Sequence, residues 1–343
     1  MSISELKLNQ IHAMAAVEQG GALAPFSYEP SPLGPFEVEI EISHCGLCHS
    51  DLHLLHNDWQ NTVYPLIPGH EIIGKVIERG QSVQELALGQ RVGVGWQRSS
   101  CQQCQWCHQG ENNLCAKQEA TCVGHYGGFA QRIRVDSRFA FAIPELLSSE
   151  NAAPLLCGGA TVFSPLIQHQ VNGLSRIAVV GIGGLGHLAI QFASAFGAEV
   201  YALSTSQNKE EEAKKFGAHH FVDEKSLKRH KNSFDLILMT SSSPIDWDLY
   251  LSLLRPKGKL CILGAPPANI EASIFSLLPE RKTICASNIA SPPDIQEMLR
   301  FAAMHQIVAQ TELFEMSDAN RALQKLAANE IRYRAVLTNN LGG

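Results

Sequence analysis

One glycine-rich segment constrains the fold of this chain more than any other. An apolar run, Ile177–Val180, leads directly into a glycine turn, and apolar residues then recur at helical spacing over Leu185–Phe196. The turn places Gly181, Gly183 and Gly186 in a G-x-G-x-x-G pattern between a strand and a helix. The pattern predicts a dinucleotide-binding unit.

Each glycine has a physical role in that interpretation. Gly181 allows the tight turn, Gly183 lets the backbone approach a pyrophosphate, and Gly186 lets helix and strand pack closely. The helix N-terminus offers free N–H groups and the positive end of its dipole to phosphates. We therefore expect Gly184 and Leu185, which complete the turn, to bind the cofactor as well.

The sequence after this turn continues as a nucleotide-binding sheet should. In a chain with 27 glycines a bare motif could arise by chance, but another strand-like run, Glu199–Leu203, follows where the next strand belongs. More strand-like runs come later, with helical patterns such as that from Trp247 between several of them: His220–Asp223, Phe234–Met239, Lys259–Gly264 and Thr283–Ser287. Alternating strands and helices predict an α/β fold with a parallel sheet covered on both faces.

The composition excludes several classes of protein. A chain of 343 residues favours two domains. A net charge of −6 gives no basic surplus for nucleic acid. Two uncharged stretches, Asn151–Ser175 and Ile177–Ala198, are interrupted by Pro165 and by the glycine turn, which indicates buried elements rather than membrane spans. Residues 1–10 lack the apolar core of a signal peptide. We expect a cytoplasmic protein without nucleic-acid or membrane partners.

The first half of the chain reads as a compact β domain. Val38–Ile42 alternates apolar and acidic residues, which predicts a half-exposed strand. Shorter strand patterns follow at Lys75–Glu78 and Gly89–Val94, separated by turns.

The most specific pattern in the chain joins four cysteines with the spacing C-x2-C-x2-C-x7-C: Cys101, Cys104, Cys107 and Cys115. Four thiolates this close in sequence can surround Zn²⁺ tetrahedrally. An iron–sulfur cluster is the alternative, but its usual bacterial run has a shorter last gap followed by proline, and here Ala116 follows. Disulfides are disfavoured in a reducing cytosol. The pattern predicts a structural zinc lobe, with Cys122 outside it.

A second metal centre is possible from the remaining donors. Catalytic zinc needs three protein ligands and an open position. The candidates are Cys45 or Cys48, then His70, then Cys157. A buried apolar cysteine, a surface histidine and an unused C-x-x-C explain the same residues equally well, so spacing alone leaves both interpretations open.

Together these motifs resemble the zinc-containing medium-chain alcohol dehydrogenases, in their cinnamyl-alcohol-dehydrogenase-like branch. The resemblance covers nearly the whole chain and is carried by the four-cysteine lobe and by several segments: Cys48–His53, Gly69–Glu71, Pro154–Phe163, Gly181–Gly186 and Ser204–Ser206. Two further segments, Thr311–Ser317 and Arg332–Leu337, are most similar to bacterial NADPH-dependent broad-range aldehyde reductases.

The resemblance implies a fold and an assembly. A discontinuous GroES-like, β-rich zinc catalytic domain would comprise residues 1–155 and 291–343. A Rossmann NADP-binding domain would comprise residues 156–290. The C-terminal part reads as a helix from Asp294, a second helix at Ala319–Ala328 and a closing strand at Ala335–Thr338, which in this family returns to the first domain. Homo-oligomers, dimeric or tetrameric, are expected.

The resemblance also implies a ligand set. Cys48, rather than Cys45, would bind the catalytic zinc with His70 and Cys157. Asp51 would hold the free ring nitrogen of the ligand histidine.

Further roles follow from the same resemblance. Glu71 would lie behind the metal and assist ligand exchange. Ser50 and His53 would form a proton relay. His49 would contact the cofactor pyrophosphate, and Thr161 would lie near the nicotinamide.

Two tryptophans, Trp59 and Trp96, match positions that wall the substrate pocket, although ordinary packing would also explain them. His44 and His56 are expected to be surface histidines.

The cofactor preference depends on the residues after the second strand of the unit. NAD enzymes usually place Asp or Glu there to bind the ribose 2′-hydroxyl. Here Ser204 and Thr205 stand instead, followed by Lys209. Hydroxyls and an ammonium bind a 2′-phosphate, which a carboxylate would repel. Lys209 could also simply begin a solvated helix, since Glu210–Glu212 follow. The missing acid favours NADP(H).

The expected function is reversible hydride transfer between NADP(H) and a linear or aromatic aldehyde, with two zinc ions per chain. An NAD-dependent alcohol or polyol dehydrogenase is the alternative, although polyol enzymes usually carry the acid and a different third ligand. A metal-free quinone reductase would lack Cys48, His70 and Cys157. A protein without enzymatic activity would not need Ser50 and His53.

Overall fold

A computed structural model describes residues 10–264 and 269–341 of the chain. The chain divides into two compact units. The β-rich unit comprises residues 1–157, 291–303 and 308–343, and the α/β unit comprises residues 158–290 and 304–307.

The α/β unit is built on a six-stranded parallel sheet with the order β12-β11-β10-β13-β14-β15. Its strands are β10 (Arg176–Val180), β11 (Glu199–Ser204), β12 (His220–Asp223), β13 (Phe234–Met239), β14 (Leu254–Ile262) and β15 (Thr283–Ala286). Counted in chain order this is 3-2-1-4-5-6, the arrangement of dinucleotide-binding sheets, in which ligands bind where the order reverses. The α/β prediction is confirmed.

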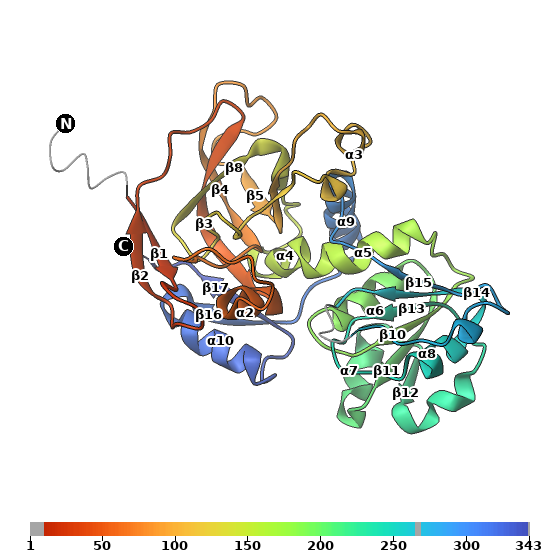
Figure 1. The fold of residues 1–343 in the computed structure, drawn as a ribbon. Coiled ribbons are helices and arrows are strands. Elements are labelled where there is room, and N and C mark those ends of the chain that lie inside the picture. The colour runs from red at the N-terminus through yellow and green to blue at the C-terminus, as the bar shows by residue number, and fades with distance from the viewer. Residues whose placement is uncertain (1–9, 265–268, 342–343) are drawn as a thin grey trace, which may run out of the picture. The chain divides into compact units, whose positions relative to one another are not determined.

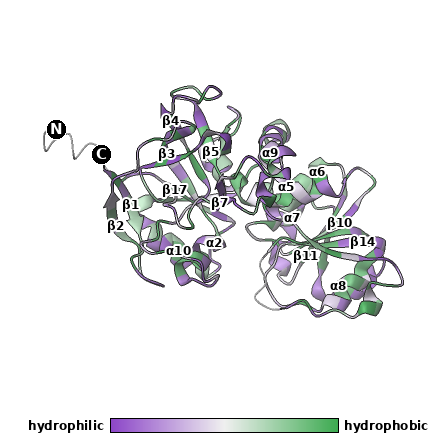
Figure 2. Cartoon of the chain, turned by 45° about the horizontal axis from the view of Figure 1, so that its top comes forward, coloured by the Kyte–Doolittle hydropathy of each residue, from purple (hydrophilic) through white to green (hydrophobic). Residues whose placement is uncertain are grey.

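Helices cover this sheet on both faces. They are α5 (Gly158–Gln168), α6 (Gly186–Ala195), α7 (Glu210–Lys215) and α8 (Trp247–Leu253), with short 3-10 turns η4 (Gln207–Lys209), η5 (Glu224–His230) and η6 (Ile274–Ser276). Trp247 and Leu251 of α8 join one apolar cluster with Ala178 and Val180, so alternate residues of β10 face α8. Figure 1 shows α5 and α6 together on one side of the sheet, and Figure 2 colours α6 largely hydrophobic.

The central parts of the uncharged stretches form buried helices and a buried strand of this unit, whereas residues 151–157 belong to the β-rich unit. Leu188, Ala189 and Ile190 of α6 and Val162 of α5 are completely buried. Among the described residues, no helix combines the length and apolar character needed to cross a membrane.

The β-rich unit is built on a sheet with the order β16-β17-β3-β4-β5-β9, and β8 also pairs with β3. These strands are β3 (Glu37–Leu47), β4 (Ile72–Arg79), β5 (Arg91–Val94), β8 (Arg132–Asp136), β9 (Ala140–Ala142), β16 (Thr311–Glu315) and β17 (Arg334–Thr338). Two small sheets pair β1 (Ile11–Ala15) with β2 (Ala24–Tyr28), and β6 (Gln97–Ser99) with β7 (Glu119–Ala120).

The helices of this unit are short. They are α2 (His49–His56), α3 (Gln105–His108), α4 (Ser149–Ala152), α10 (Ala319–Ala327) and α9 (Pro292–His305), of which residues 292–303 belong here. The 3-10 turns are η1 (Asn112–Leu114), η2 (Ser137–Phe139), η3 (Ala153–Leu156) and η7 (Met316–Asp318).

The C-terminal segment is part of the same sheet as the first strands. Strand β17 lies between β16 and β3, parallel to the former and antiparallel to the latter, and Ala335 is directly opposite Leu47. The last strand of the chain therefore lies beside the strand that leads to Cys48.

The predicted half-exposed strand at Val38–Ile42 holds for Glu41 but is wrong for Glu39, whose side chain is buried. Arg132 of β8 donates to Glu39 Oε1 at 2.6 Å, and Arg134 binds the other carboxylate oxygen. The two guanidinium groups provide the hydrogen bonds that a buried carboxylate requires.

Candidate active site

Three metal-type donors converge in the β-rich unit. Cys48 lies at the N-terminus of α2, His70 in the loop before β4, and Cys157 directly after η3. The two sulfur atoms are 4.0 Å apart. One donor atom from each residue, together with a carboxylate oxygen of Glu71, lies within 4.8 Å of the others. The structure thus brings the three predicted ligands together.

The imidazole of His70 is arranged as a ligand. The side chain is completely buried, and its Nε2 has no hydrogen-bond partner. Its Nδ1 lies 3.3 Å from Asp51 Oδ1. When the carboxylate accepts the Nδ1 proton, the lone pair of Nε2 is directed at the two thiols, as in histidines that bind metals. Zinc fits this donor set, and Cys45, which is buried and directs its thiol to the Gly46 carbonyl, is not part of it.

The contact between the two sulfur atoms favours a thiolate at Cys48. A hydrogen bond from the Cys157 thiol lowers the pKa of Cys48 well below its usual range, against the opposing effect of burial. The thiolate is the form that binds metal.

Asp51 links the helix to the histidine. Its Oδ2 accepts from the Cys48 backbone N–H at 2.9 Å, and its Oδ1 accepts from the Gly69 N–H at 2.9 Å. Asp51 is the third residue of α2, so the first contact is a helix cap. One buried carboxylate therefore fixes the start of α2, the Pro-Gly turn and the ring of His70.

Glu71 lies beside the donors and has a partner that the sequence did not reveal. Arg334 of β17 donates to Glu71 Oε1, and both side chains are buried. Burial raises the pKa of Glu71 to about 7, although Arg334 acts in the opposite direction. The available signal was an arginine at the start of the otherwise apolar strand Arg334–Leu337, since a charge in a buried strand needs a partner.

The predicted relay residues lie on one face of α2. Ser50 Oγ is 3.6 Å from Cys48 Sγ, and His53 lies one turn further along, with its side chain 35% exposed. His53 Nδ1 is 2.7 Å from Asp58 Oδ2. Asp58 is a second residue that the sequence reasoning missed, although its position five residues after His53 could have suggested it.

The two predicted pocket tryptophans lie beside these residues. Trp96 contacts His70 edge-to-face with ring centroids 4.9 Å apart, and Trp59 lies 5.9 Å from Trp96. Trp59 also contacts His53 at 5.2 Å. The aromatic rings thus connect the donor centre to the partly exposed His53.

The four-cysteine lobe is a separate centre. Its four sulfur atoms lie within 4.8 Å of one another, with Cys104 and Cys107 3.6 Å apart and Cys101 and Cys107 3.9 Å apart. Zinc–sulfur bonds of about 2.3 Å in a tetrahedron require sulfur separations of about 3.8 Å, so the lobe fits zinc. Backbone N–H groups of Gln103 and Cys104 lower the pKa of Cys101 to about 6.

Cys122 is not a member of the lobe. It is buried in a small apolar cluster with Leu54 and Leu66, and its sulfur lies 4.0 Å from His70 Nδ1.

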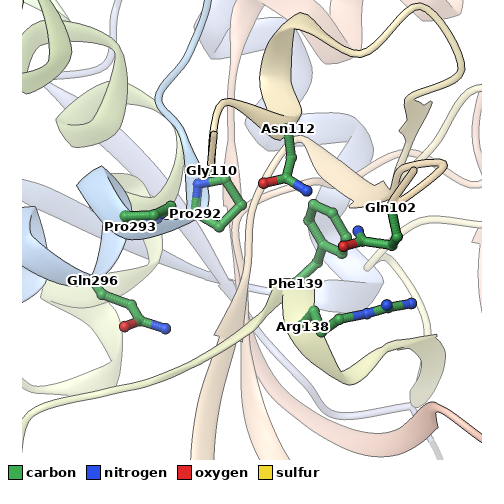
Figure 3. Close-up of a pocket in the computed structure, with 8 residues that line it drawn as sticks. All are labelled: Gln102, Gly110, Asn112, Arg138, Phe139, Pro292, Pro293 and Gln296. Atoms are coloured by element: carbon green, nitrogen blue, oxygen red, sulfur yellow. The ribbon is translucent and has the colours of Figure 1, made fainter. Parts of the chain in front are cut away.

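A cavity of about 250 Å³ opens beside the lobe. Figure 3 shows its lining, which comes from the lobe, η2 and the start of α9: Gln102, Gly110, Asn112, Arg138, Phe139, Pro292, Pro293 and Gln296. It adjoins the four-cysteine lobe rather than the donors around His70.

The glycine turn of the α/β unit has the expected geometry. Gly181 has a φ of +89°, and a Cβ at Gly186 would lie 1.9 Å from the Gly181 oxygen, so both positions require glycine. A Cβ at Gly183 would meet no atom within 4 Å, which leaves the backbone open to a ligand. Helix α6 begins at Gly186, directly after Gly184 and Leu185. His187, which the sequence reasoning did not single out, has its Nδ1 2.9 Å from the Gly183 oxygen.

The residues predicted to distinguish NADP(H) from NAD(H) lie near this turn. Ser204 ends β11 and accepts from the Ser206 N–H at 3.1 Å, and Thr205 is exposed. Lys209 Nζ donates to the Ile182 carbonyl at 2.7 Å. The Lys209 side chain therefore contacts the glycine turn rather than only beginning a solvated helix.

Two further predicted residues lie in different units. His49 is exposed on α2 of the β-rich unit, whereas Thr161 is buried in α5 of the α/β unit.

Comparisons with known proteins bear on the family and the fold. Residues 34–145 match the alcohol dehydrogenase GroES-like domain, and residues 184–304 match the zinc-binding dehydrogenase family. The aldehyde reductase AdhA of Synechocystis sp. is 41% identical, over 96% of this chain and 99% of that protein.

Two solved structures are also similar. The cinnamyl alcohol dehydrogenase SbCAD4 of Sorghum bicolor has a TM-score of 0.92 and 35% identity, over 96% of this chain and 97% of that one. The Helicobacter pylori enzyme CAD, solved with NADP(H), has a TM-score of 0.90 and 32% identity, over 96% and 98% of the two chains.

Fold and donor set thus define an oxidoreductase of the zinc-binding type. The chain belongs to the zinc-containing medium-chain alcohol dehydrogenase family, with GroES-like and Rossmann domains. It is an alcohol dehydrogenase or aldehyde reductase, and the predicted family and reaction class are confirmed.

Proposed function

We propose that this enzyme interconverts aldehydes and primary alcohols by hydride transfer with NADP(H), over a broad range of linear and aromatic substrates. The observation that carries the proposal is the buried, unpartnered Nε2 of His70 facing the sulfur atoms of Cys48 and Cys157. Such a centre beside an aromatic wall suits a small carbonyl compound.

Cys48, His70 and Cys157 would hold the catalytic zinc, and a zinc ion held there supplies Lewis acidity towards a carbonyl oxygen. Asp51 keeps the His70 ring in the orientation that this requires. Glu71, paired with Arg334, places a carboxylate beside the donors without leaving its charge uncompensated.

The proton path uses Ser50 and His53. Because the Asp58 carboxylate accepts the proton on His53 Nδ1, Nε2 is the atom that exchanges a proton with the Ser50 hydroxyl and the solvent. His53 is partly exposed, so it can deliver that proton to water.

Three observations support NADP(H) as the preferred cofactor. Ser204 and Thr205 occupy the place of the usual acid, and Lys209 brings an ammonium to the glycine turn. The similar Helicobacter pylori enzyme was solved with NADP(H). Gly181, Gly183 and the residues up to Gly186 would bind the pyrophosphate, His49 would contact it, and Thr161 would lie near the nicotinamide.

We also assign a structural zinc to the four-cysteine lobe and expect two zinc ions per chain in a homo-oligomer. The catalytic domain would comprise residues 1–155 and 291–343, and the cofactor domain residues 156–290. Trp59 and Trp96 would wall the substrate pocket, because they contact His53 and His70.

Initial rates of cofactor oxidation test the proposal. Purified zinc-loaded protein would be offered NADPH and NADH separately, each with a panel of linear and aromatic aldehydes and with a quinone. We expect turnover with NADPH across many aldehydes. If a protein that holds two zinc ions oxidises neither cofactor with any aldehyde, the proposed function is contradicted.

A further inference from the structure

A second group of thiols lies on the last two strands of the α/β unit. Cys261 of β14 and Cys285 of β15 are direct partners in the parallel register, and His169 follows α5. One donor atom from each residue lies within 4.8 Å of the other two. Cys261 is completely buried, whereas Cys285 and His169 are partly exposed.

The hydrogen bonds of His169 determine where its proton lies. Lys259 Nζ is 3.3 Å from His169 Nδ1, and His169 Nε2 is 3.5 Å from Cys285 Sγ. An ammonium can only donate, so Nδ1 accepts and the ring proton is on Nε2. The imidazole therefore directs an N–H, not a lone pair, at the Cys285 sulfur.

This pattern is the reverse of the one at the zinc-type centre. There, His70 faces a carboxylate with Nδ1 and presents Nε2 as a free acceptor. A histidine that binds metal uses that arrangement. At Cys285 the flanking group is a cation, so the arrangement opposes metal binding and instead stabilises a thiolate.

The three ionisable neighbours Cys261, His169 and Lys259 act in the same direction. The Cys261 thiol, then His169 and Lys259, lower the pKa of Cys285 to about 5 against the opposing effect of burial. The pKa of Cys261 is raised because its thiol donates to Cys285. A protonated Cys285 would instead donate to the Leu260 carbonyl, 3.6 Å away. At neutral pH the pair is thus one thiolate and one thiol.

We propose that Cys261 and Cys285 form a redox-active pair, which a hydroperoxide oxidises to a disulfide between β14 and β15. Neighbouring strands are about 4.8 Å apart, and directly paired residues point to the same face. A disulfide accepts Cα separations of about 4.4–6.8 Å, so the register of these strands already meets its requirement.

The reaction has two steps. The Cys285 thiolate attacks one oxygen of the hydroperoxide, so an S–O bond forms, the O–O bond breaks, and the other oxygen leaves as an alcohol or water after protonation. Cys261 then attacks the sulfenic sulfur of Cys285. The S–S bond forms, the S–O bond breaks, and the oxygen leaves as water with the Cys261 proton. Two thiols and one hydroperoxide give one disulfide, one water and one alcohol, or two waters when hydrogen peroxide is used.

The oxidised form would join the outermost strand of the sheet to its neighbour. Strand β15 pairs only with β14 among the described strands, so this bond would fix the edge of the sheet covalently. Thiols would restore the reduced form.

Peptide mapping of the full-length, zinc-loaded enzyme tests the proposal. The protein would be treated with hydrogen peroxide at pH 7, blocked with N-ethylmaleimide and digested. We expect the peptides containing Cys261 and Cys285 to become linked at least tenfold faster than any other cysteine pair, with no zinc released. Dithiothreitol should reverse the link. Absence of this linked peptide, or its formation only after zinc release, would overturn the proposal.

Three variants separate the roles. In Cys261→Ser, the reaction should stop at a sulfenic acid on Cys285, which dimedone traps. In Cys285→Ser, neither this sulfenic acid nor the disulfide should form. His169→Gln should slow the reaction roughly tenfold, because it removes the donor that stabilises the thiolate. Equal rates in His169→Gln and the unchanged enzyme would contradict the role of the imidazole.

A metal titration tests whether the cluster of Cys261, Cys285 and His169 binds a metal ion instead. A third equivalent of zinc or cadmium per chain that disappears in Cys285→Ser would show that the cluster is a metal site and would refute the redox assignment. We expect the unchanged enzyme and Cys285→Ser to bind the same number of metal ions per chain.

Discussion

Arg334, from the last strand of the chain, donates to Oε1 of Glu71 inside the β-rich unit, and both side chains are buried. Breaking a buried pair from one side leaves an uncompensated charge, which costs about 3–5 kcal/mol. We therefore expect Arg334→Met to lower the free energy of unfolding by about this amount, measured by urea denaturation of the zinc-loaded protein.

A matched surface pair controls for the loss of an arginine. Arg321 and Asp318 are 2.8 Å apart but largely exposed, so Arg321→Met should cost less than about 1 kcal/mol. Adding Glu71→Gln to Arg334→Met should restore part of the stability, since the orphan charge is then removed. Equal effects of the two arginine variants would contradict the interpretation.

Loss of a zinc ligand should remove activity without removing the cofactor. Cys48→Ala or His70→Ala should lower kcat by at least about 10³-fold, because Lewis acidity contributes several kcal/mol to the reaction. NADPH binding, followed by fluorescence titration, should persist. Cys45→Ala is the matched control within the same C-x-x-C, and it should retain turnover and both zinc ions. Normal activity in either ligand variant would exclude the assigned zinc set.

Asp51 should act through the metal ligand rather than on substrate. Asp51→Asn should weaken zinc binding about 10–100-fold, because the His70 ring loses its carboxylate partner. Competition with a chromogenic chelator measures this change. Asp58→Asn is the control, since Asp58 contacts His53 and not His70. It should leave zinc affinity unchanged and slow turnover. Equal zinc affinities in the two variants would argue against the role given to Asp51.

The cofactor preference should depend on charge at the end of β11. Ser204→Asp keeps an acceptor for the Ser206 N–H, so the turn should survive the change. A carboxylate there repels a 2′-phosphate, and we expect KM for NADPH to rise at least about tenfold more than KM for NADH, which corresponds to about 1.4 kcal/mol. Steady-state kinetics with both cofactors measure the ratio of KM for NADPH to KM for NADH. An unchanged ratio in Ser204→Asp would count against a role of this position in cofactor preference.

Alkylation of Cys285 should follow an unusual pH profile. Only the thiolate reacts, and the pKa of Cys285 is lowered to about 5. The rate with iodoacetamide should therefore be nearly constant above pH 6 and should fall as the pH drops through 5. The urea-unfolded protein is the control, and its thiols should lose reactivity below pH 8.5. A folded profile that matches the unfolded one would contradict the thiolate assignment.

Local patterns were sufficient to predict much of the fold. The strands at His220–Asp223 and Phe234–Met239 have the predicted bounds. The second is largely buried and apolar, as strands inside a parallel sheet are. The glycine turn could also be predicted from the sequence. The backbone of the turn itself requires glycine at Gly181 and Gly186, so the pattern lies within a few residues.

Long-range pairings could not be predicted in the same way. Arg334 and Glu71 are 263 positions apart, and Glu39 depends on arginines 93 and 95 positions away. Alternation of apolar and acidic residues predicts which face a strand buries, but not whether a neighbouring strand supplies cations to that face. The proposed ligands Cys48 and Cys157 are 109 positions apart, and resemblance rather than spacing singled out the set around His70.

The position of β17 between β16 and β3 has a consequence for how the protein is made. A nascent chain that has reached Ala290 already contains Cys48, His70 and Cys157, but the strand that carries Arg334 has not been synthesised. Until it arrives, β3 keeps an open edge beside Leu47, and Glu71 lacks its cation. The buried pair of Glu71 and Arg334 can therefore form only after strands β10–β15 of the α/β unit have been synthesised.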